Sequence, residues 1–423
     1  MYKFKLNLRK VVAIATCLVA SVAVFAQTTD VYVGGAANGK ATVWKNEIPQ
    51  YLSESGEILS VVVVDGNVYA IGIEGVDAKV WKNNEVLYSL TVTSPYYALV
   101  PTSIAISGND IYVTTYELTE TFSYIGRFWK NGLEQSNYED AAELQSVFVD
   151  GDDVYVAGRT NSLATIWRNG TPIYTYDSDY DASFISVVVA DGDVYYMGGD
   201  YGGYGKNALK DNTIKREPIS KNTNDYGVNV WKNDEILYTL DTEVYGGDLY
   251  FSNGVLYAVG QTPDANAVYQ AKIWVDGVGT VLENVWSAAS SVFVDGTDVY
   301  VAGFRGDYPE LDAIIWKNGE AIPLTTDGYN SANSVFIVGE STGISEIENT
   351  NVEIYPNPVK DVLKIENNEL QINKIEILNL LGKTIYQFDH PSNQINSSAL
   401  SQGIYFVKLE TNKGIVIKKF VKE

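Results

Sequence analysis

Seven tryptophans recur along this chain, and their spacing constrains the fold more than any other feature. They are Trp44, Trp81, Trp129, Trp167, Trp231, Trp274 and Trp316. Around each, the chain repeats a pattern such as SVFVDGDDVYVAG followed by ATIWRNG, found within residues 146–170. Self-similarity at a period of roughly 40 residues is typical of repeat architectures, in which each unit buries its apolar faces against its neighbours.

One unit, beginning at Ser146, is predicted to contain four short strands joined by tight turns. The predicted strands are 146–149, 154–158, 164–167 and 172–176. Asp150-Gly151 follows the first strand and Asn169-Gly170 follows the third. Both dipeptides indicate tight hairpin turns, because glycine accepts the positive φ that such turns need. Each unit is therefore predicted to be a four-stranded antiparallel sheet.

The two ends of the repeat region are incomplete in complementary ways. Residues 31–34 match the second strand of the unit, and residues 334–338 match a first strand with nothing after it. Paired, they complete one more unit and remove the free sheet edges that favour aggregation. We predict an all-β fold: a seven-bladed β-propeller closed by a shared N- and C-terminal blade, followed by a small β-sandwich. Six or eight blades are the alternatives, and a solenoid is the rival architecture.

The repeated tryptophan is expected to be structural. An indole at the same position of every unit, beside a turn, is expected to pack between adjacent blades, because a buried indole contributes a large apolar area. Stacking on a ligand is the alternative interpretation.

Four segments are predicted along the chain. Residues 1–26 have the basic start, the apolar run and the small residues before a cleavage site that are typical of a secretory signal peptide, so the mature chain begins at Gln27. Residues 27–340 form the propeller, 341–351 a polar linker and 352–423 a C-terminal β-sandwich. We expect no transmembrane segment.

The charge is concentrated in the repeat region. Without the four basic residues of 1–26, the formal charge falls from −23 to −27, and residues 352–423 carry +1, so the repeat region holds −28. A surface this acidic repels nucleic acid and anionic membranes, which we exclude as partners. The chain's one histidine, His390, lies in the C-terminal segment. The repeat region therefore lacks the histidine of a Ser-His-Asp or Cys-His site, and we name no catalytic residue.

A ligand site is expected on the face that carries the longer, variable loops. Aromatic residues precede the first strand of several units there, and we propose Tyr96, Tyr180, Trp286 and Tyr329 as ligand-binding residues. Flat aromatic faces suit sugar rings or extended peptides. Packing of these rings within their own loops is the alternative.

Two further loops are candidates for function. One loop places three carboxylates at every second residue, on Asp177, Asp179 and Asp181. This spacing can supply several oxygen ligands to Ca²⁺, and a solvated acidic loop is the alternative. No other cofactor is expected. The 28-residue insertion 200–227 carries five basic residues, and it is either functional or a tolerated insertion.

The C-terminal segment carries a recognisable set of motifs. They are Tyr355-Pro356-Asn357-Pro358, a turn around Gly382, a strand beginning at Gly403, and Lys418-Lys419 near the end. In this order the segment resembles the type A C-terminal sorting domain of the type-nine (Por) secretion system of Bacteroidetes. The resemblance implies passage through the periplasm, recognition by the secretion machinery, and release or attachment at the cell surface, commonly with removal of the tail.

The sequence thus predicts a secreted or cell-surface propeller that binds an extracellular glycan or protein. The alternative is an extracellular polysaccharide hydrolase or lyase that uses carboxylate or tyrosine residues on the loop-rich face.

Overall fold

The computed structural model describes residues 29–423 except for 92–98, 120–122, 136–137, 139–140, 161–162, 178–181, 201–226, 243, 340–351, 368–370, 381, 389–391 and 412–413. The predicted signal peptide, linker and basic insertion therefore lie wholly or almost wholly outside the described residues. So do Tyr96, Tyr180, Asp179 and Asp181.

The described residues between 30 and 338 form seven antiparallel sheets of four strands each, which we call sheets A to G. Sheet A combines β28 (Ser331–Val338) with β1 (Asp30–Ala37), β2 (Lys40–Lys45) and β3 (Ile48–Tyr51). Sheet B contains β4 (Glu57–Val64), β5 (Asn67–Glu74), β6 (Asp77–Lys82) and β7 (Glu85–Leu90). Sheet C contains β8 (Leu99–Ser107), β9 (Asp110–Leu118), β10 (Tyr124–Lys130) and β11 (Leu133–Gln135). Sheet D contains β12 (Ala141–Asp150), β13 (Asp153–Thr160), β14 (Ala164–Arg168) and β15 (Thr171–Tyr176).

The remaining three sheets continue the same order along the chain. Sheet E contains β16 (Ala182–Ala190), β17 (Asp193–Asp200), β18 (Gly227–Lys232) and β19 (Glu235–Thr242). Sheet F contains β20 (Tyr245–Ser252), β21 (Val255–Pro263), β22 (Tyr269–Val275) and β23 (Val278–Val281). Sheet G contains β24 (Ser287–Asp295), β25 (Asp298–Arg305), β26 (Asp312–Lys317) and β27 (Glu320–Thr325). The prediction of an all-β chain built from four-stranded sheets is confirmed.

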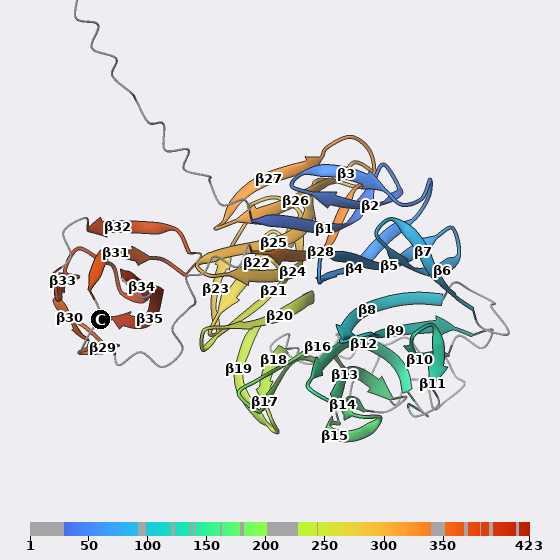
Figure 1. Ribbon diagram of the computed structural model, residues 1–423, viewed down its shortest axis with the longest axis horizontal. Coiled ribbons are helices and arrows are strands. Elements are labelled where there is room, and N and C mark those ends of the chain that lie inside the picture. Colours follow the sequence, from blue (N-terminus) through green and yellow to red (C-terminus); the bar gives the residue numbers. More distant parts are fainter. Residues whose placement is uncertain are drawn as a thin grey trace, which may run out of the picture.

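The first strand of each sheet lies innermost, and these strands contact one another in a cycle (Figure 1). The cycle runs from β28 to β4, β8, β12, β16, β20 and β24, and back to β28. The expected pairing of the two chain ends is present, because Asp30 of β1 lies opposite Val338 of β28 and Gly34 lies opposite Ser334. Strands from opposite ends of the repeat region thus share sheet A.

Each tryptophan of the repeat is buried at a contact between two neighbouring sheets. Trp81 of sheet B, for example, packs in one apolar cluster with Tyr32 and Val43 of sheet A. Trp167 of sheet D packs with Phe128 of sheet C and with Tyr138, which lies between β11 and β12. The same arrangement recurs for Trp44, Trp129, Trp231, Trp274 and Trp316. The structural interpretation of the tryptophans is confirmed, and the apolar core is divided among these contacts.

A polar latch, which the sequence analysis did not identify, joins the second and third strands of the sheets. In sheet D, Asn169 has a φ of 51°, and its backbone N–H donates to the carbonyl of Val154 at 2.8 Å. Its side-chain oxygen accepts from the Val154 N–H at 2.9 Å, and its amide donates to Asp153 at 2.7 Å. Arg168 pairs with Asp153 and lies over the Tyr155 ring. Equivalent latches are built on Asn46, Asn83, Asn131, Asn233 and Asn318.

A ring of small polar side chains lies on the inner strands. The hydroxyl of each serine in this ring accepts a hydrogen bond from a backbone N–H of the next inner strand, as from Val61 to Ser334 at 3.1 Å. Further members are Ser103, Ser146, Ser186 and Ser291. Asp248 takes this position in sheet F and accepts from both Ser186 and Ser291 at 3.0 Å. Burial raises the pKa of Asp248.

The C-terminal domain has two sheets facing each other. One contains β29 (Val352–Tyr355), β30 (Val362–Asn367) and β33 (Gln394–Asn396); the other contains β31 (Ile372–Leu378), β32 (Thr384–Phe388), β34 (Gly403–Thr411) and β35 (Gly414–Lys422). Val352, Leu363, Ile377, Val407 and Phe420 are core residues between the sheets. Across the described residues, no helix is long and apolar enough to cross a membrane.

Candidate functional site

Loops of sheets G and A form a joined surface on the loop-rich face. Asn330 lies at its centre with no solvent exposure. Its amide donates to the carbonyl of Leu311 at 2.7 Å and to the carbonyls of Asp327 and Gly328, both at 3.1 Å. Its side-chain oxygen accepts from the Asn38 N–H at 2.8 Å. One buried side chain therefore joins the loops before β26, before β28 and between β1 and β2.

Two tyrosines are presented to solvent by these joined loops. Tyr308 is 78% exposed and Tyr329 is 43% exposed. The backbone carbonyl of Tyr329 accepts from the Gly39 N–H at 3.0 Å, which fixes its main chain on sheet A. Burial, followed by the nearby Glu57 carboxylate and Tyr308, raises the pKa of Tyr329. The Tyr329 phenol is therefore a neutral hydrogen-bonding group at physiological pH.

Glu57 adds a carboxylate beside this surface. Its side chain accepts from the Asn333 amide at 3.1 Å and from the Ser331 hydroxyl at 3.4 Å. Asn333 also donates to the carbonyl of Ile58 at 2.9 Å, so the inner strands of sheets A and B both hold the group in place. We call Glu57, Tyr308, Tyr329 and Asn333 the tyrosine cluster.

Trp286 lies in a neighbouring loop of sheet G but is packed differently. Its ring is partly buried, with the Phe304 ring centroid 5.3 Å away, and its carbonyl accepts from the Gly306 N–H at 2.9 Å. Next to it, Arg305 pairs with Glu283 at 3.1 Å and with Asp312 at 3.3 Å. The structure thus places Tyr329 on the exposed cluster and Trp286 within a loop-packing contact.

Sequence analysis missed Tyr308, Glu57 and Asn330. Tyr308 does not precede an inner strand, so the aromatic pattern could not identify it. Glu57 is a single acid in an acidic domain. Asn330 resembles any polar loop residue, and its role depends on three backbone segments that meet only in the folded chain.

The predicted calcium loop is represented by Asp177 alone, since its other two carboxylates lie outside the described residues. Among the residues that the structure does describe, no three His, Cys, Asp or Glu side chains gather in a group that could hold a metal ion.

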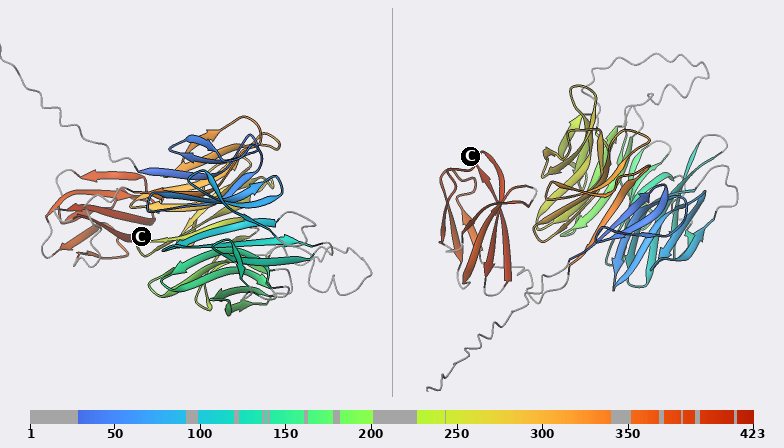
Figure 2. Two further views of the ribbon diagram at one scale, coloured as in Figure 1. Left: turned by 45° about the vertical axis from the view of Figure 1, so that its right-hand side comes forward. Right: turned by 90° about the horizontal axis from the view of Figure 1, so that it is seen from above.

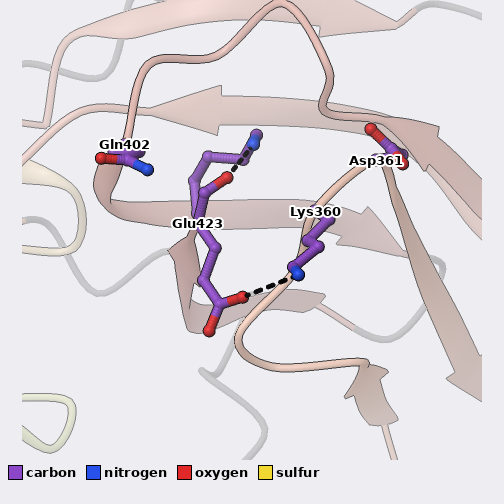
Figure 3. A pocket seen from close by; sticks show the side chains of 5 residues that line it. Lys360, Asp361, Gln402 and Glu423 are labelled. Carbon is purple, nitrogen blue, oxygen red and sulfur yellow. Dashed lines mark hydrogen bonds and ion pairs between the residues drawn. The ribbon is translucent and has the colours of Figure 1, made fainter.

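The C-terminal domain has an open hollow of about 640 Å³ near the end of the chain (Figure 3). Lys360, Asp361, Gln402 and Glu423 line it, together with Lys422. Lys360 and Glu423 approach within 3.9 Å across it. The hollow is open, and two of the side chains that line it, Lys360 and Glu423, are largely exposed, so it is not a formed ligand site.

The predicted sorting motif has a structural role within the C-terminal domain. Asn357 donates from its amide to the carbonyl of Lys419 at 3.1 Å and accepts from the Val421 N–H at 2.9 Å. The Lys364 ammonium lies over the Tyr355 ring. The first motif of the domain therefore holds its last strand, although 62 residues separate Asn357 from Lys419.

Comparison with known families supports this assignment. Residues 353–423 match the family described as "Secretion system C-terminal sorting domain". The C-terminal segment is thus a type-nine secretion sorting domain, and the protein is exported to the cell surface or beyond it. No curated protein matches the chain.

Three solved structures that are similar to the chain are distant in sequence. A polysaccharide lyase of family 25, an ulvan lyase, has 10% identity, covers 93% of this chain and 97% of its own, and has a TM-score of 0.40. A quinoprotein alcohol dehydrogenase-like protein from Bacteroides thetaiotaomicron has 12% identity, coverage of 73% and 78%, and a TM-score of 0.39. A family-43 glycoside hydrolase from Xanthomonas citri has 13% identity, coverage of 64% and 84%, and a TM-score of 0.33. No activity is transferred from likenesses this remote.

Proposed function

We propose that residues 27–340 form a seven-bladed β-propeller that acts outside the cell as a binding or adhesion module. The seven sheets, the cycle of inner-strand contacts and the pairing of β1 with β28 support the propeller. The sorting domain accounts for delivery and leaves the propeller as the part that acts at the destination.

The tyrosine cluster is the observation that carries the binding proposal. Tyr308 and Tyr329 expose aromatic surface on loops that the buried Asn330 side chain holds together. Preformed aromatic surface costs little conformational entropy on binding, and tyrosine adds a hydroxyl for hydrogen bonds. An extracellular glycan or an extended protein segment is the ligand that this chemistry suits.

The test is a binding screen against glycans, polysaccharides and peptides with the chain from residue 27 onward. We expect at least one ligand whose binding is lost on combined Tyr308→Ala and Tyr329→Ala substitution. Tyr51→Ala is the matched control, because Tyr51 is also well exposed but lies on the outer strand β3. If binding survives the double substitution, the site lies elsewhere.

A polysaccharide hydrolase or lyase is the second candidate. The Glu57 carboxylate beside two tyrosines on the same surface is the observation that favours it, because carboxylates and tyrosine are suitable proton-transfer groups. Glu57→Gln separates the candidates: it abolishes product release if the cluster is catalytic, whereas a binding module releases no product in either form. Titration with Ca²⁺ and with a chelator tests the metal proposal at Asp177, Asp179 and Asp181.

A further inference from the structure

Sheet F departs from the repeat at the polar latch. In sheets A, C, D, E and G the latch also contains an ion pair between an Asp at the start of the second strand and a Lys or Arg at the end of the third, as between Asp298 and Lys317 in sheet G at 2.8 Å. Sheet B has Asn67 and Lys82 at these positions. In sheet F the two equivalent positions are Val255 and Val275, and Asp276 replaces the latch asparagine. Asp276 still makes the backbone contacts, at 2.9 and 3.1 Å to Leu256. The backbone contacts of the latch are thus kept, while two apolar side chains take the places of the charged pair.

Those two valines lie on the turn face, which carries the short turns between the first and second strands and between the third and fourth strands of the sheets, and they are nevertheless buried. Val275 is 1% exposed and Val255 is 3% exposed. The apolar cluster that contains them also contains Leu378 and Phe406 of the C-terminal domain, which are paired across β31 and β34. Leu380 and Ile417 pack against the same cluster. The C-terminal domain lies beside sheets F and G in both ribbon views (Figures 1 and 2).

Polar contacts also join the C-terminal domain to sheets F and G. Lys419 pairs with Asp276 at 2.5 Å, so the C-terminal domain supplies a cation where sheet F lacks its own. In sheet G, Lys383 pairs with Glu320 at 2.8 Å. Gly382 has a φ of 75°, and a Cβ on it would lie 1.9 Å from the Thr297 carbonyl oxygen. This approach permits only glycine.

We propose that the turn face of sheet F, with the adjoining turns of sheet G, is a docking site dedicated to this chain's own sorting domain. Sheet F lacks the charged pair of the latch at the place where the sorting domain packs against it. The sorting domain covers the two valines with Leu378 and Phe406 and supplies a positive charge with Lys419. Docking covers Gly382 and pairs Lys419, two residues of the sorting motif. The docked chain therefore presents the opposite side of the sorting domain to the secretion machinery.

A single cysteine tests the docking directly. The chain's one natural cysteine, Cys17, precedes residue 27, so Val275→Cys is the sole thiol of the chain from residue 27 onward. A bulky maleimide should react slowly with it. Phe406→Asp should increase the rate about tenfold or more, because it removes a buried aromatic contact. Lys360→Glu, a charge change elsewhere on the same domain, should leave the rate unchanged. An equal rate in the presence and absence of Phe406→Asp overturns the proposal.

A second variant leaves the sorting domain untouched. Val255→Asp, Val275→Lys and Asp276→Asn together rebuild the latch of the other sheets. We expect a propeller that melts at or above the wild-type temperature and a released sorting domain, seen as a larger radius of gyration in solution scattering. A folded variant with the wild-type radius would refute the docking site.

Discussion

Replacing Asn169 by alanine should measure what one polar latch contributes to stability. Asn169 lies in sheet D, away from both the tyrosine cluster and the docking site. The substitution removes the acceptor of the Val154 N–H, which we expect to cost about 1 kcal/mol. It also forces a residue with a Cβ to keep a φ of 51° without asparagine's local hydrogen bonds, which costs roughly 1–2 kcal/mol. The bond to Asp153 is exposed to solvent and adds little.

The expected loss is therefore about 2–3 kcal/mol in the free energy of unfolding, measured by chemical denaturation. Asn169→Gly is the matched control, because glycine accepts the positive φ and loses only the side-chain bonds. We expect roughly half the loss for it. Equal stabilities of the alanine and glycine variants would show that backbone strain is not part of the latch. No loss in either would refute the latch altogether.

Three further predictions concern other parts of the fold. Trp167→Ala should cost about 3–5 kcal/mol, because the indole is buried between sheets C and D; an unchanged thermal melt would contradict this packing. Asp248→Ser restores serine to the inner ring. Because burial raises the folded-state pKa of Asp248 above its ordinary 3.8, its contribution to stability is present below that value and is lost as the pH rises through the folded pKa. The stability of the serine variant relative to wild type should therefore increase over that range in pH-dependent denaturation, and a constant difference would exclude titration of Asp248. Asn330→Ala should speed hydrogen exchange at Gly39 and Leu311 and weaken ligand binding at the tyrosine cluster, and unchanged exchange would show that Asn330 does not join these loops.

Several of these features could be predicted from the sequence because each depends on neighbours in the chain. The strands and tight turns follow from alternating apolar residues and Asn-Gly or Asp-Gly pairs. The burial of the tryptophans follows from their recurrence at one place in every unit. The sorting domain follows from motifs that keep their order over about 70 residues, and the family match at 353–423 confirms it.

The tyrosine cluster could not be predicted in this way. Tyr329 was identified because it precedes an inner strand, whereas Trp286 satisfies the same rule and packs against Phe304 instead. Exposure of a ring depends on which loop lies over it, and loops of different units meet only when the inner strands have closed their cycle. Asn330 shows the same limit, since its partners are contributed by loops before β26 and β28 and by the turn after β1.

By itself, then, the sequence determined the repeating unit, its strand order, the pairing of the two chain ends and the C-terminal sorting domain, because these depend on local periodicity and on motifs. Only the tertiary structure decided which aromatic rings face solvent, which carboxylate is enclosed within the inner ring, and where the sorting domain is seated. The valines of sheet F illustrate the physical reason. Val255 and Val275 are ordinary strand residues in the sequence, and their departure from the repeat gains meaning only when Leu378, Phe406 and Lys419 are packed against that turn face.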